Sequence, residues 1–558
     1  MKKVFVTLLA ILLIMAMLAA CGGGAQTGGA TTAAAATTAA AAATTAAAAT
    51  TAATTVAAAP EPDPLTFWVS SDSLISSFDD NKYTKMMQEK TNTKLTFVIA
   101  PSEEALDKLN LLFASGSELP DAFLGIPNFT RATMVKYASQ GFFLPLNDLL
   151  KNAPNYQMMI AEYPFIEPMV TAPDGNIYVV ASYGKAEPNM FSQRFWINTD
   201  FLDALGKTKE EIVTLDDFYD YLIGVRDNDV NGNGDKSDEI PLTGSKDGWS
   251  PQIDGFFISS FILNDMDTYC EVIDESTIRF NADKPEFKAG LEWLHKLAVE
   301  QLLDPNAYTQ TNDQLRELCE SGDVPKVGSV TSGGTHMFCN NNGTRKESYW
   351  FLLPLEGPTG IRQARYTRYD GVGVSSFLIS SDTKYAEACI RFADYQLTEE
   401  ATLWNRYGEP GVDWVVPPEG TMGVDGNPAR YEEILKWEAI QNAHWRGKGT
   451  GWGRFGSYAR ADDGDPYELE SILWQSYIAY LPYANMGILP PLMFEEDEAD
   501  EMTTLKKLIT DHVKQNIAAF IYGQRPLNEF DAYVQELNDF GLQDYVDIQQ
   551  KAFDRQWK

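Results

Sequence analysis

The stretch LTFWVSSDSLISSFDDNKYTKMMQEKTNTKLTFVIA, residues 65–100, contains the pattern that decides the fold. In it and just beyond it, β-rich runs alternate with helix-like segments, in the order 65–69 (strand), 79–91 (helix), 94–99 (strand), 103–113 (helix) and 119–124 (strand). This order predicts a parallel β-sheet with helices on both of its faces.

Polar and aromatic residues follow the first predicted strand. Open parallel sheets bind ligands beyond the carboxyl ends of their strands, and both Trp68 and Asp72 stand at such an end. We therefore treat both as candidate ligand-binding residues. For Trp68 the alternative is a place in the hydrophobic core.

The rest of the chain continues the mixture of helices and strands. The expected elements are strand 195–197, helices 200–205, 214–226 and 287–301, strands 326–330 and 371–379, and helices 386–395, 431–444, 501–522 and 527–540. Thr214 is expected to cap the helix at 214–226, because threonine side chains accept hydrogen bonds from first-turn N–H groups. These elements predict an α/β protein.

Length and charge restrict the organisation and the partners. The chain from residue 64 to 558 exceeds the ~250–300 residues at which a single core stops growing, so two lobes are expected. The net charge of -34 repels phosphate groups, which makes nucleic acid and anionic lipid poor partners. Aromatic residues make up 12% of the sequence, enough to supply both core and ligand-stacking surfaces.

The N-terminus has the features of an export signal. Lys2 and Lys3 precede a mostly apolar run at 4–20, and Leu18-Ala19-Ala20-Cys21 follows the pattern of a cleavage site. A cysteine in this place resembles the bacterial lipobox, which predicts a signal peptide at 1–20 and a lipid anchor on Cys21. The alternative is an uncleaved anchor helix with an incidental cysteine.

The segment after Cys21 is a predicted tether. Residues 25–59 are almost entirely Ala and Thr, a composition that cannot bury a hydrophobic face. We assign residues 21–63 to a lipidated cysteine and a flexible linker, which lets the folded part move near the membrane. The expected location is the outer face of the cytoplasmic membrane.

Four cysteines remain in the folded part: Cys270, Cys319, Cys339 and Cys389. They form no C-x-x-C pair, which excludes a zinc ribbon or a thioredoxin motif. One or two disulfides are compatible with an exported protein, and so are buried free thiols.

Several short segments, taken in order, resemble extracellular solute-binding proteins of ABC importers, in the lipoprotein-type oligosaccharide-binding branch. They are SGSELPD (115–121), GFFLPLN (141–147), DGNIY (174–178), WINTDFL (196–202), EQLLDP (300–305), GEPGVDW (408–414) and the tail at 523–552. Each segment alone is weakly specific, whereas the ordered set spans almost the whole mature chain. Pro410 departs from the small or apolar residue usual at that position.

The resemblance implies a periplasmic-binding-protein-like fold, in which two α/β lobes joined by a hinge close a cleft on a saccharide. The implied lobe boundaries are 64–184 for lobe 1, 185–370 for lobe 2, and 371–558 for a return to lobe 1 with C-terminal helices shared across the lobes. Hinge crossings are expected near 180–191 and 370–376. The partners that the resemblance implies are a saccharide, in this branch an oligosaccharide, and an ABC transporter permease. The protein is expected to be a monomer.

The loop DNDVNGNGDKSDE, residues 227–239, predicts a structural calcium site. Its hard oxygen ligands alternate with glycines that allow a tight turn. One register uses Asp229, Asn231, Asn233, the carbonyl of Asp235, and Asp238 or Glu239 as ligands. A second register starts at Asp227 and ends at Asp238. The alternative is an Asx-rich turn without metal.

Three further aromatic residues are candidates for sugar stacking: Tyr183 near the expected hinge, Trp249 after a strand of lobe 2, and Trp452 in a glycine-rich loop. The loop also contains Gly451-x-Gly453-x-x-Gly456, which spells a dinucleotide-binding motif. Because a predicted helix at 431–444 precedes it instead of a strand, we reject a nucleotide cofactor.

Two other classes of function stay open at this stage. A secreted glycan-acting enzyme would need a pair of carboxylates a few ångströms apart, which sequence cannot single out. No G-x-S-x-G or H-E-x-x-H motif occurs, and no catalytic residue is assigned. A ligand-loaded sensor subunit is the third class. The prediction is a membrane-anchored, non-enzymatic protein that captures a saccharide for import.

Overall fold

A computed structural model describes residues 61–558 except 185, 437–438 and 454–459. The expected signal peptide, Cys21 and nearly all of the expected tether lie outside the described residues. Two separate hydrophobic cores, and a small cluster beside the second, organise the described part of the chain.

The elements around the first core, here called lobe 1, are β1 (Asp63–Ser70), α1 (Lys82–Thr91), β2 (Thr93–Ala100), α2 (Ala105–Ser115), β3 (Ala122–Leu124), α3 (Arg131–Ser139), α4 (Asn147–Leu150), α5 (Pro154–Glu162), α6 (Ile166–Val170), β12 (Leu378–Ile379), α12 (Ala386–Gln396) and α13 (Glu399–Tyr407). The elements around the second core and its neighbouring cluster, here called lobe 2, are β5 (Phe195–Asn198), α7 (Thr199–Ala204), α8 (Leu215–Asp227), α9 (Ile253–Phe257), β6 (Cys270–Ile273), β7 (Thr277–Phe280), α10 (Pro285–Val299), α11 (Asn312–Glu320), β8 (Ser329–Thr331), β9 (Tyr349–Leu352), α14 (Leu469–Tyr480), α15 (Glu496–Ile521), α16 (Phe530–Asp539) and α17 (Leu542–Trp557). Short strands outside these sets are β4 (Ser182–Tyr183), β10 (Ala364–Arg365), β11 (Val372–Gly373), β13 (Trp414–Val415), β14 (Glu432–Glu433) and β15 (Ala484–Asn485).

The sheet of lobe 1 has the strand order β12-β3-β1-β2. β1 pairs in parallel with both β2 and β3, as the alternating pattern predicts, whereas β12 joins β3 in antiparallel fashion. Phe67, Trp68 and Val69 of β1 are all buried, because helices cover both faces of this central strand. The edge strand β2 is partly exposed, with Val98 and Ile99 at the surface.

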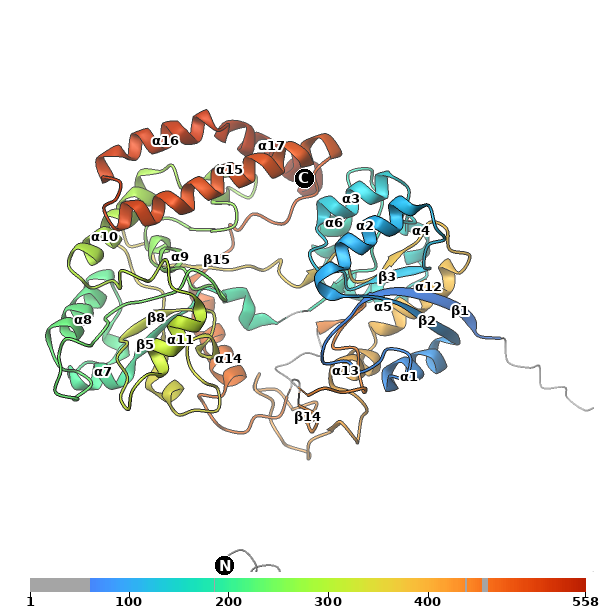
Figure 1. Cartoon of the computed structure of the whole chain (residues 1–558), viewed down its shortest axis with the longest axis horizontal. Helices are drawn as coiled ribbons and strands as arrows, with labels where there is room; N and C mark the ends of the chain where they lie inside the picture. Colours follow the sequence, from blue (N-terminus) through green and yellow to red (C-terminus); the bar gives the residue numbers. More distant parts are fainter. Residues whose placement is uncertain (1–60, 185, 437–438, 454–459) are drawn as a thin grey trace, which may run out of the picture. The chain divides into compact units, whose positions relative to one another are not determined.

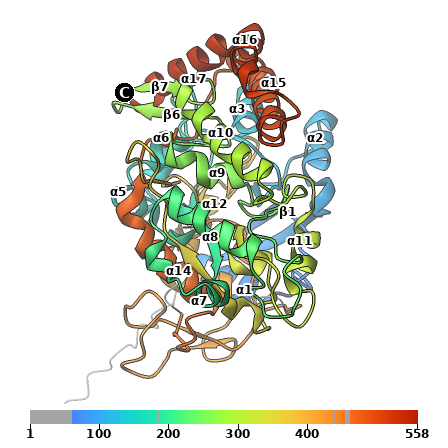
Figure 2. The ribbon, with the colours of Figure 1, turned by 90° about the vertical axis from the view of Figure 1, so that its left-hand side faces the viewer.

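Lobe 2 is built on the antiparallel sheet β8-β5-β9. The helix α8 begins where the sequence predicts, because the Thr214 hydroxyl accepts a hydrogen bond from the Asp217 N–H at 3.1 Å. The β6–β7 hairpin contacts α17, as Figure 2 shows.

The segments expected to form the hinge lie beside each other, because β4 pairs antiparallel with β11. The hydroxyls of Ser182 and Ser376 are 2.7 Å apart and reinforce this pairing. Gly371 has a φ of 94°, and a Cβ there would lie 2.5 Å from the carbonyl oxygen of Gly184, so only glycine fits. The N–H of Tyr183 also donates to the carbonyl of Gly451 at 2.9 Å.

The C-terminal helices pack on lobe 2 and also contact lobe 1. α15 contacts α10, α16 and α17, and Figure 1 shows these helices gathered together. α15 also contacts α3, and the Gln556 amide donates to the carbonyl oxygen of Pro168 at 2.8 Å. Any movement of lobe 1 relative to lobe 2 therefore has to break or rearrange these contacts between the C-terminal helices and lobe 1.

Two predicted elements are wrong. The segment 371–379 is not one strand, because it changes partner: β11 pairs with β4, and β12 pairs with β3. The described part of 431–444 forms β14 and turns instead of a helix. Backbone groups of Gln441, Asn442 and Ala443 bond to residues 74–83 of lobe 1, which leaves them unavailable for helical bonds.

The four cysteines of the folded part, Cys270, Cys319, Cys339 and Cys389, are buried free thiols. Burial raises the pKa of each of them. Of the two states that the sequence leaves open, the structure has the free thiols, which remain protonated and unreactive at neutral pH.

We expect Glu498→Gln to lower the free energy of unfolding at pH 7 by on the order of 2 kcal/mol. The Glu498 side chain is 6% exposed, and Arg555 and Lys551 of α17 reach it at 2.9 and 2.6 Å. Burial raises its pKa, but hydrogen bonds from these two cations outweigh burial and lower the pKa to about 2.

The folded pKa of Glu498 therefore lies below the ordinary value of 4.5. Its contribution is complete above that ordinary value and is lost as the pH falls toward about 2. Urea titrations of both proteins at several pH values between 7 and 3 measure the difference. A stability gap that stays constant over this range would contradict the assignment.

Candidate functional site

A cavity of about 520 Å³, here called the interlobe cavity, is lined by both lobes. Lobe 1 contributes residues 129–132 at the start of α3, and lobe 2 contributes residues 265–268 and the first half of α15. Residues 365–374, which lead into the hinge strand β11, complete the wall. A molecule in this cavity contacts both lobes and the hinge at once.

Ion pairs occupy the polar part of this cavity. Arg365 contacts the buried carboxylate of Asp265 at 2.8 Å, and Lys506 contacts Asp267 at 2.9 Å. Burial lowers the pKa of Arg131 to about 10, and the negative charge of Asp370 opposes that shift. Arg131 therefore stays protonated at neutral pH.

A second cavity of about 500 Å³, here called the lobe-2 cavity, shares Asp267 and Arg365 with the first. Its lining includes the buried carboxylate of Asp254, which is 3% exposed and accepts a hydrogen bond from the Tyr308 hydroxyl at 3.0 Å. Burial raises the pKa of Asp254. The shared residues make the two cavities neighbours along one surface.

The carboxyl edge of the lobe 1 sheet carries a polar cluster. Asp72 accepts a hydrogen bond from Arg446 at 3.2 Å and caps the turn at Leu74 through the Leu74 N–H at 2.9 Å. Lys448 donates to the Ser70 hydroxyl at 2.9 Å. Burial lowers the pKa of Lys448, and Asp72 opposes that shift. The predicted residue Asp72 is thus part of a fixed, charged edge.

Trp249 is held by unusually close backbone packing. A Cβ on Gly333 would lie 2.2 Å from the Trp249 ring, so the indole rests directly on the glycine backbone. The ring of His336 lies 5.8 Å away, and the guanidinium of Arg194 is 5.8 Å from the indole centroid. Burial and nearby positive charges lower the pKa of His336, so its ring is neutral at pH 7.

The other predicted aromatic residues lie deeper. Trp68 is 2% exposed and packs in the lobe 1 core, where its ring lies 6.5 Å from Phe123. Tyr183 is buried against Tyr163, with ring centroids 4.6 Å apart. Trp452 is also buried, and its backbone forms a bridge with Tyr183.

The structure thus brings Tyr183 and Trp452 together at the hinge and leaves Trp249 on lobe 2. None of the five predicted ligand-binding residues lines the interlobe cavity or the lobe-2 cavity. The charged residues that do line them were missed, because they come from segments far apart in the chain and match no local motif. No local sequence pattern indicates the close packing of the Trp249 ring on Gly333 either.

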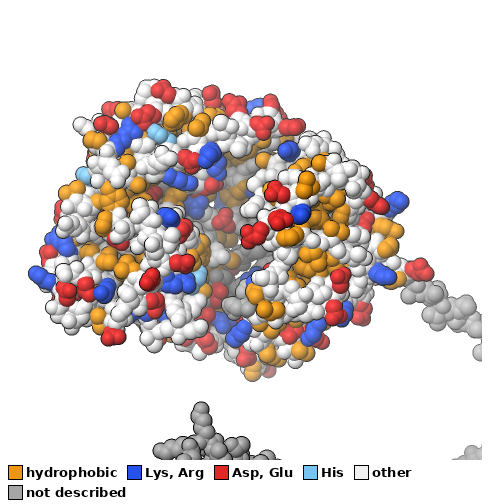
Figure 3. All heavy atoms as spheres, viewed as in Figure 1, with side chains coloured by type: hydrophobic (Ala, Val, Ile, Leu, Met, Phe, Trp, Pro, Cys, Tyr) orange, Lys and Arg blue, Asp and Glu red, His pale blue; other side chains and the backbone are white. Residues whose placement is uncertain are grey.

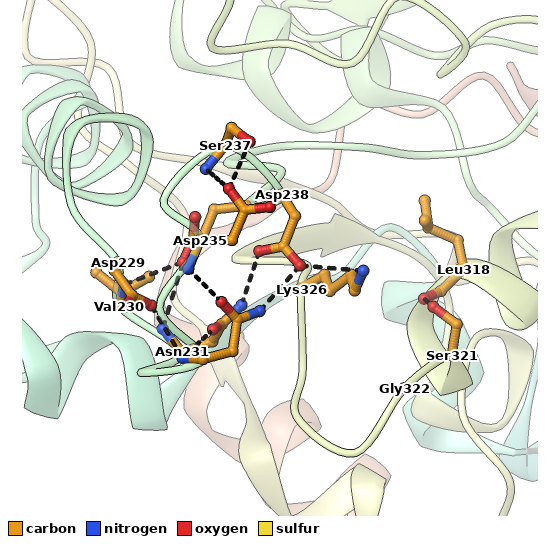
Figure 4. Close-up of polar contacts among 12 residues, drawn as sticks. Asp229, Val230, Asn231, Asp235, Ser237, Asp238, Leu318, Ser321, Gly322 and Lys326 are labelled. Carbon is orange, nitrogen blue, oxygen red and sulfur yellow. Dashed lines mark hydrogen bonds and ion pairs between the residues drawn. The ribbon is translucent and has the colours of Figure 1, made fainter.

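The loop at 227–239 is compact and rich in oxygen atoms (Figure 4). Asp229 accepts hydrogen bonds from the N–H groups of Asn233 and Gly234 at 3.1 and 2.8 Å. Asn233 and Asp235 each accept from a backbone N–H two residues further on, at 2.7 and 3.0 Å.

The acidic end of this loop closes back on its start. Asp238 accepts hydrogen bonds from the amides of Asn231 and Asn233 at 3.2 and 2.9 Å, and Lys326 contacts it at 3.0 Å. Glu239 accepts from the Val230 N–H at 3.1 Å, while its other oxygen is buried without a hydrogen-bond partner. Burial and the charges of the neighbouring carboxylates raise the pKa of Glu239.

Asp227, the first ligand of the second register, pairs with the adjacent Arg226 at 2.8 Å. Within the described residues, no group of three or more His, Cys, Asp or Glu side chains has an arrangement that could hold a metal ion. Among the described helices, none combines the length and apolar character that crossing a membrane requires.

The chain belongs to the bacterial extracellular solute-binding protein family, which matches residues 68–403. A curated relative, the fructooligosaccharide ABC transporter substrate-binding protein FusA of Streptococcus pneumoniae, is 24% identical over 503 residues, which cover 88% of this chain and 90% of FusA. Members of this family bind solutes, so the chain is a solute-binding protein and not an enzyme.

Solved structures show the same fold. The structure of S. pneumoniae FusA with kestose has a TM-score of 0.69 at 22% identity, covering 88% of this chain and 99% of that chain. An EF-hand mutant of FusA with fructo-nystose has a TM-score of 0.68 at 22% identity and the same coverage. An HMO-binding solute-binding protein from Bifidobacterium longum infantis has a TM-score of 0.72 at 20% identity, covering 89% of this chain and 99% of that chain. These likenesses confirm the predicted two-lobed α/β fold class.

Proposed function

We propose that the protein captures a saccharide, an oligosaccharide in particular, and delivers it to the permease of an ABC importer. The observation that carries this proposal is the interlobe cavity, whose wall comes from both lobes and from the hinge. The names of FusA and of the HMO-binding protein support a saccharide as the ligand. Their assignment to ABC transport supports a permease as the partner.

Ligand capture works by closing the lobes. A ligand that contacts both lobes favours the closed form by its differential affinity for the two forms. The hinge pair β4–β11 stays in register while the contacts of α15 and α17 with lobe 1 change. The permease then distinguishes a loaded protein from an empty one by shape.

Anchoring follows from the N-terminal sequence. Cys21 carries the lipid, residues 21–63 form the tether, and the folded part acts as a monomer at the outer face of the cytoplasmic membrane. Two or more acyl chains give stable anchoring, because each buried methylene contributes about 0.8 kcal/mol. The lobe boundaries at 184 and 370 belong to this proposal too.

A thermal-shift screen tests the proposed function. The chain from residue 22 onward is mixed with neutral and acidic oligosaccharides, amino acids and peptides. A saccharide ligand raises the melting temperature in proportion to RT ln(1 + [L]/Kd), which amounts to about 2.7 kcal/mol at a concentration of 100 Kd. Stabilisation by peptides or amino acids without any response to saccharides would refute the saccharide assignment.

The loop at 227–239 is proposed to bind calcium in a structural role. Its donors are hard oxygens, and the orphaned buried oxygen of Glu239 marks a position where a cation compensates a desolvated carboxylate. Asp229, Asn231, Asn233, the Asp235 carbonyl, Asp238 and Glu239 would hold the ion. The EF-hand named for FusA supports the proposal, and the outward pairing of Asp227 favours this register.

Chelation is expected to lower the melting temperature by several degrees, and adding calcium should restore it. Glu239→Gln should abolish this calcium response, because the mutation removes one of the ligand charges. Asp227→Asn is the matched control, since Asp227 belongs to the other register, and it should respond like the wild type. Equal melting of the wild type in EGTA and in calcium would refute the calcium site.

A further inference from the structure

The described lining of the interlobe cavity contains as many cations as carboxylates. Its charged residues are Arg131, Arg365, Lys506, Asp265, Asp267 and Asp370. Basic and acidic side chains are also interspersed over the face drawn in Figure 3. The cavity therefore has no net formal charge at neutral pH.

The ion pair between Arg365 and Asp265 is held by several hydrogen bonds. Two guanidinium nitrogens of Arg365 reach the same oxygen of Asp265, at 2.9 Å from Nε and 2.8 Å from the terminal nitrogen. The hydroxyl of Thr268 donates to the other Asp265 oxygen at 2.6 Å. Because Asp265 is 2% exposed, this pair cannot open without leaving a buried charge uncompensated.

The other two cations are also engaged. Arg131 donates from Nε to the carbonyl oxygen of Met169 at 3.2 Å, and its charge interacts with Asp370. Lys506 lies 2.9 Å from Asp267. Two of the three cations of the described lining are thus held in ion pairs, and the third is hydrogen-bonded to a backbone carbonyl.

This arrangement discriminates against anionic ligands. A carboxylate, sulfate or phosphate that enters the cavity loses water, and its charge has to compete with an existing ion pair for compensation. The chain's net charge of -34 adds a long-range repulsion to the approach. An anionic ligand is therefore rejected because its own charge would stay uncompensated in the cavity.

The same groups suit hydroxyls. A sugar hydroxyl donates to a carboxylate and accepts from a guanidinium, so it inserts into a paired network without disturbing its charge balance. Leu489, Leu492 and Met502 line the cavity as well and offer apolar contact to the C–H faces of a sugar ring.

We propose that the ligand of the interlobe cavity is an uncharged saccharide, and that the balanced charges of the lining, with Arg365 and Lys506 held in ion pairs, exclude sugars bearing carboxylate, sulfate or phosphate groups. This inference rests on the proposed function and narrows the class of saccharide.

A binding panel with matched sugars tests the inference. The neutral probes are kestose, nystose, maltotriose and 2′-fucosyllactose, and the acidic probes are 3′-sialyllactose, trigalacturonate and triguluronate. We expect every acidic probe to bind at least roughly tenfold more weakly than the best neutral probe. The Kd of that neutral probe should not change between 50 and 500 mM NaCl, because no net charge is neutralised on binding.

An acidic probe that binds as tightly as the best neutral one would overturn the inference while leaving saccharide capture intact. No binding by any sugar would instead remove the proposed function itself. The two failures are therefore distinguishable.

Removing one carboxylate from the lining of the interlobe cavity should allow acidic sugars to bind more tightly. Asp267→Asn leaves Lys506 without its ion-pair partner, and Asp370→Asn removes a negative charge from the same lining, so acidic probes should bind at least roughly tenfold more tightly to these variants than to the wild type. Asp531→Asn makes the same charge change on the exposed surface of α16 and should have no effect. Because Asp267 and Asp370 are exposed, both variants should fold. An unchanged preference in both would overturn the role of the ion pairs.

Discussion

Arg194→Ala is expected to lower the free energy of unfolding by about 3–5 kcal/mol. Arg194 is fully buried just before β5, at the point where the chain enters lobe 2 from the hinge. Its guanidinium donates to the Ser476 hydroxyl at 2.6 Å, to the Gly333 carbonyl oxygen at 2.8 Å, and to the carbonyl oxygen of Pro188. The alanine leaves these acceptors buried and creates a cavity beside them.

Chemical denaturation followed by tryptophan fluorescence measures this loss. Arg430→Ala is the control, because Arg430 pairs with Glu399 at the surface and such pairs contribute only ~0–1 kcal/mol. If Arg194→Ala were no more destabilising than Arg430→Ala, the claim that the buried hydrogen bonds of Arg194 stabilise the fold would be refuted.

Trp249 stands in the loop whose residues Ser245, Lys246 and Gln252 line the lobe-2 cavity, next to the interlobe cavity. Trp249→Ala is therefore expected to weaken binding of a saccharide that extends from the interlobe cavity along this loop roughly 100-fold, about 2.7 kcal/mol. Trp249 is partly exposed, and the Gly333–Gly334 backbone fixes its ring before any ligand arrives. A preorganised aromatic surface loses little entropy on binding, so most of its contact energy appears as affinity. Titration calorimetry with the best neutral sugar measures the change.

Gly333→Ala should reproduce much of this loss although the tryptophan remains, because a Cβ at 2.2 Å forces the indole to move. Gly343→Ala is the matched control, since its Cβ would meet only ordinary contacts from 3.4 Å outward. Affinity within twofold of the wild type in both Trp249→Ala and Gly333→Ala would rule out Trp249 as a ligand-binding residue.

Local signals made the first lobe predictable. The β-rich run at 65–69, the helix-like segment at 79–91 and the run at 94–99 became β1, α1 and β2, because their propensities and their burial agree. Of the C-terminal helices, α15 and α16 were also predicted, whereas α17 was missed. α15 begins earlier than expected, at Glu496, because Glu495 and Glu498 form a capping box.

Contacts between distant segments were not predictable. The helix expected at 431–444 is wrong because Gln441 and Ala443 pair with lobe 1 some 360 residues away, an outcome that no local pattern encodes. The interlobe cavity likewise joins Arg131 with Asp370 and Asp265 with Arg365. The oxygen-rich loop, by contrast, is contiguous, so its composition alone suggested its chemistry.

The central claim is that the protein clasps one saccharide between its lobes and releases it unaltered. Native mass spectrometry of the soluble chain with the best sugar of the panel tests this claim most directly. The account predicts one ligand per chain and, after prolonged incubation, a released sugar of unchanged mass. Fragments of the sugar, or the absence of any bound sugar across the whole panel, would contradict it.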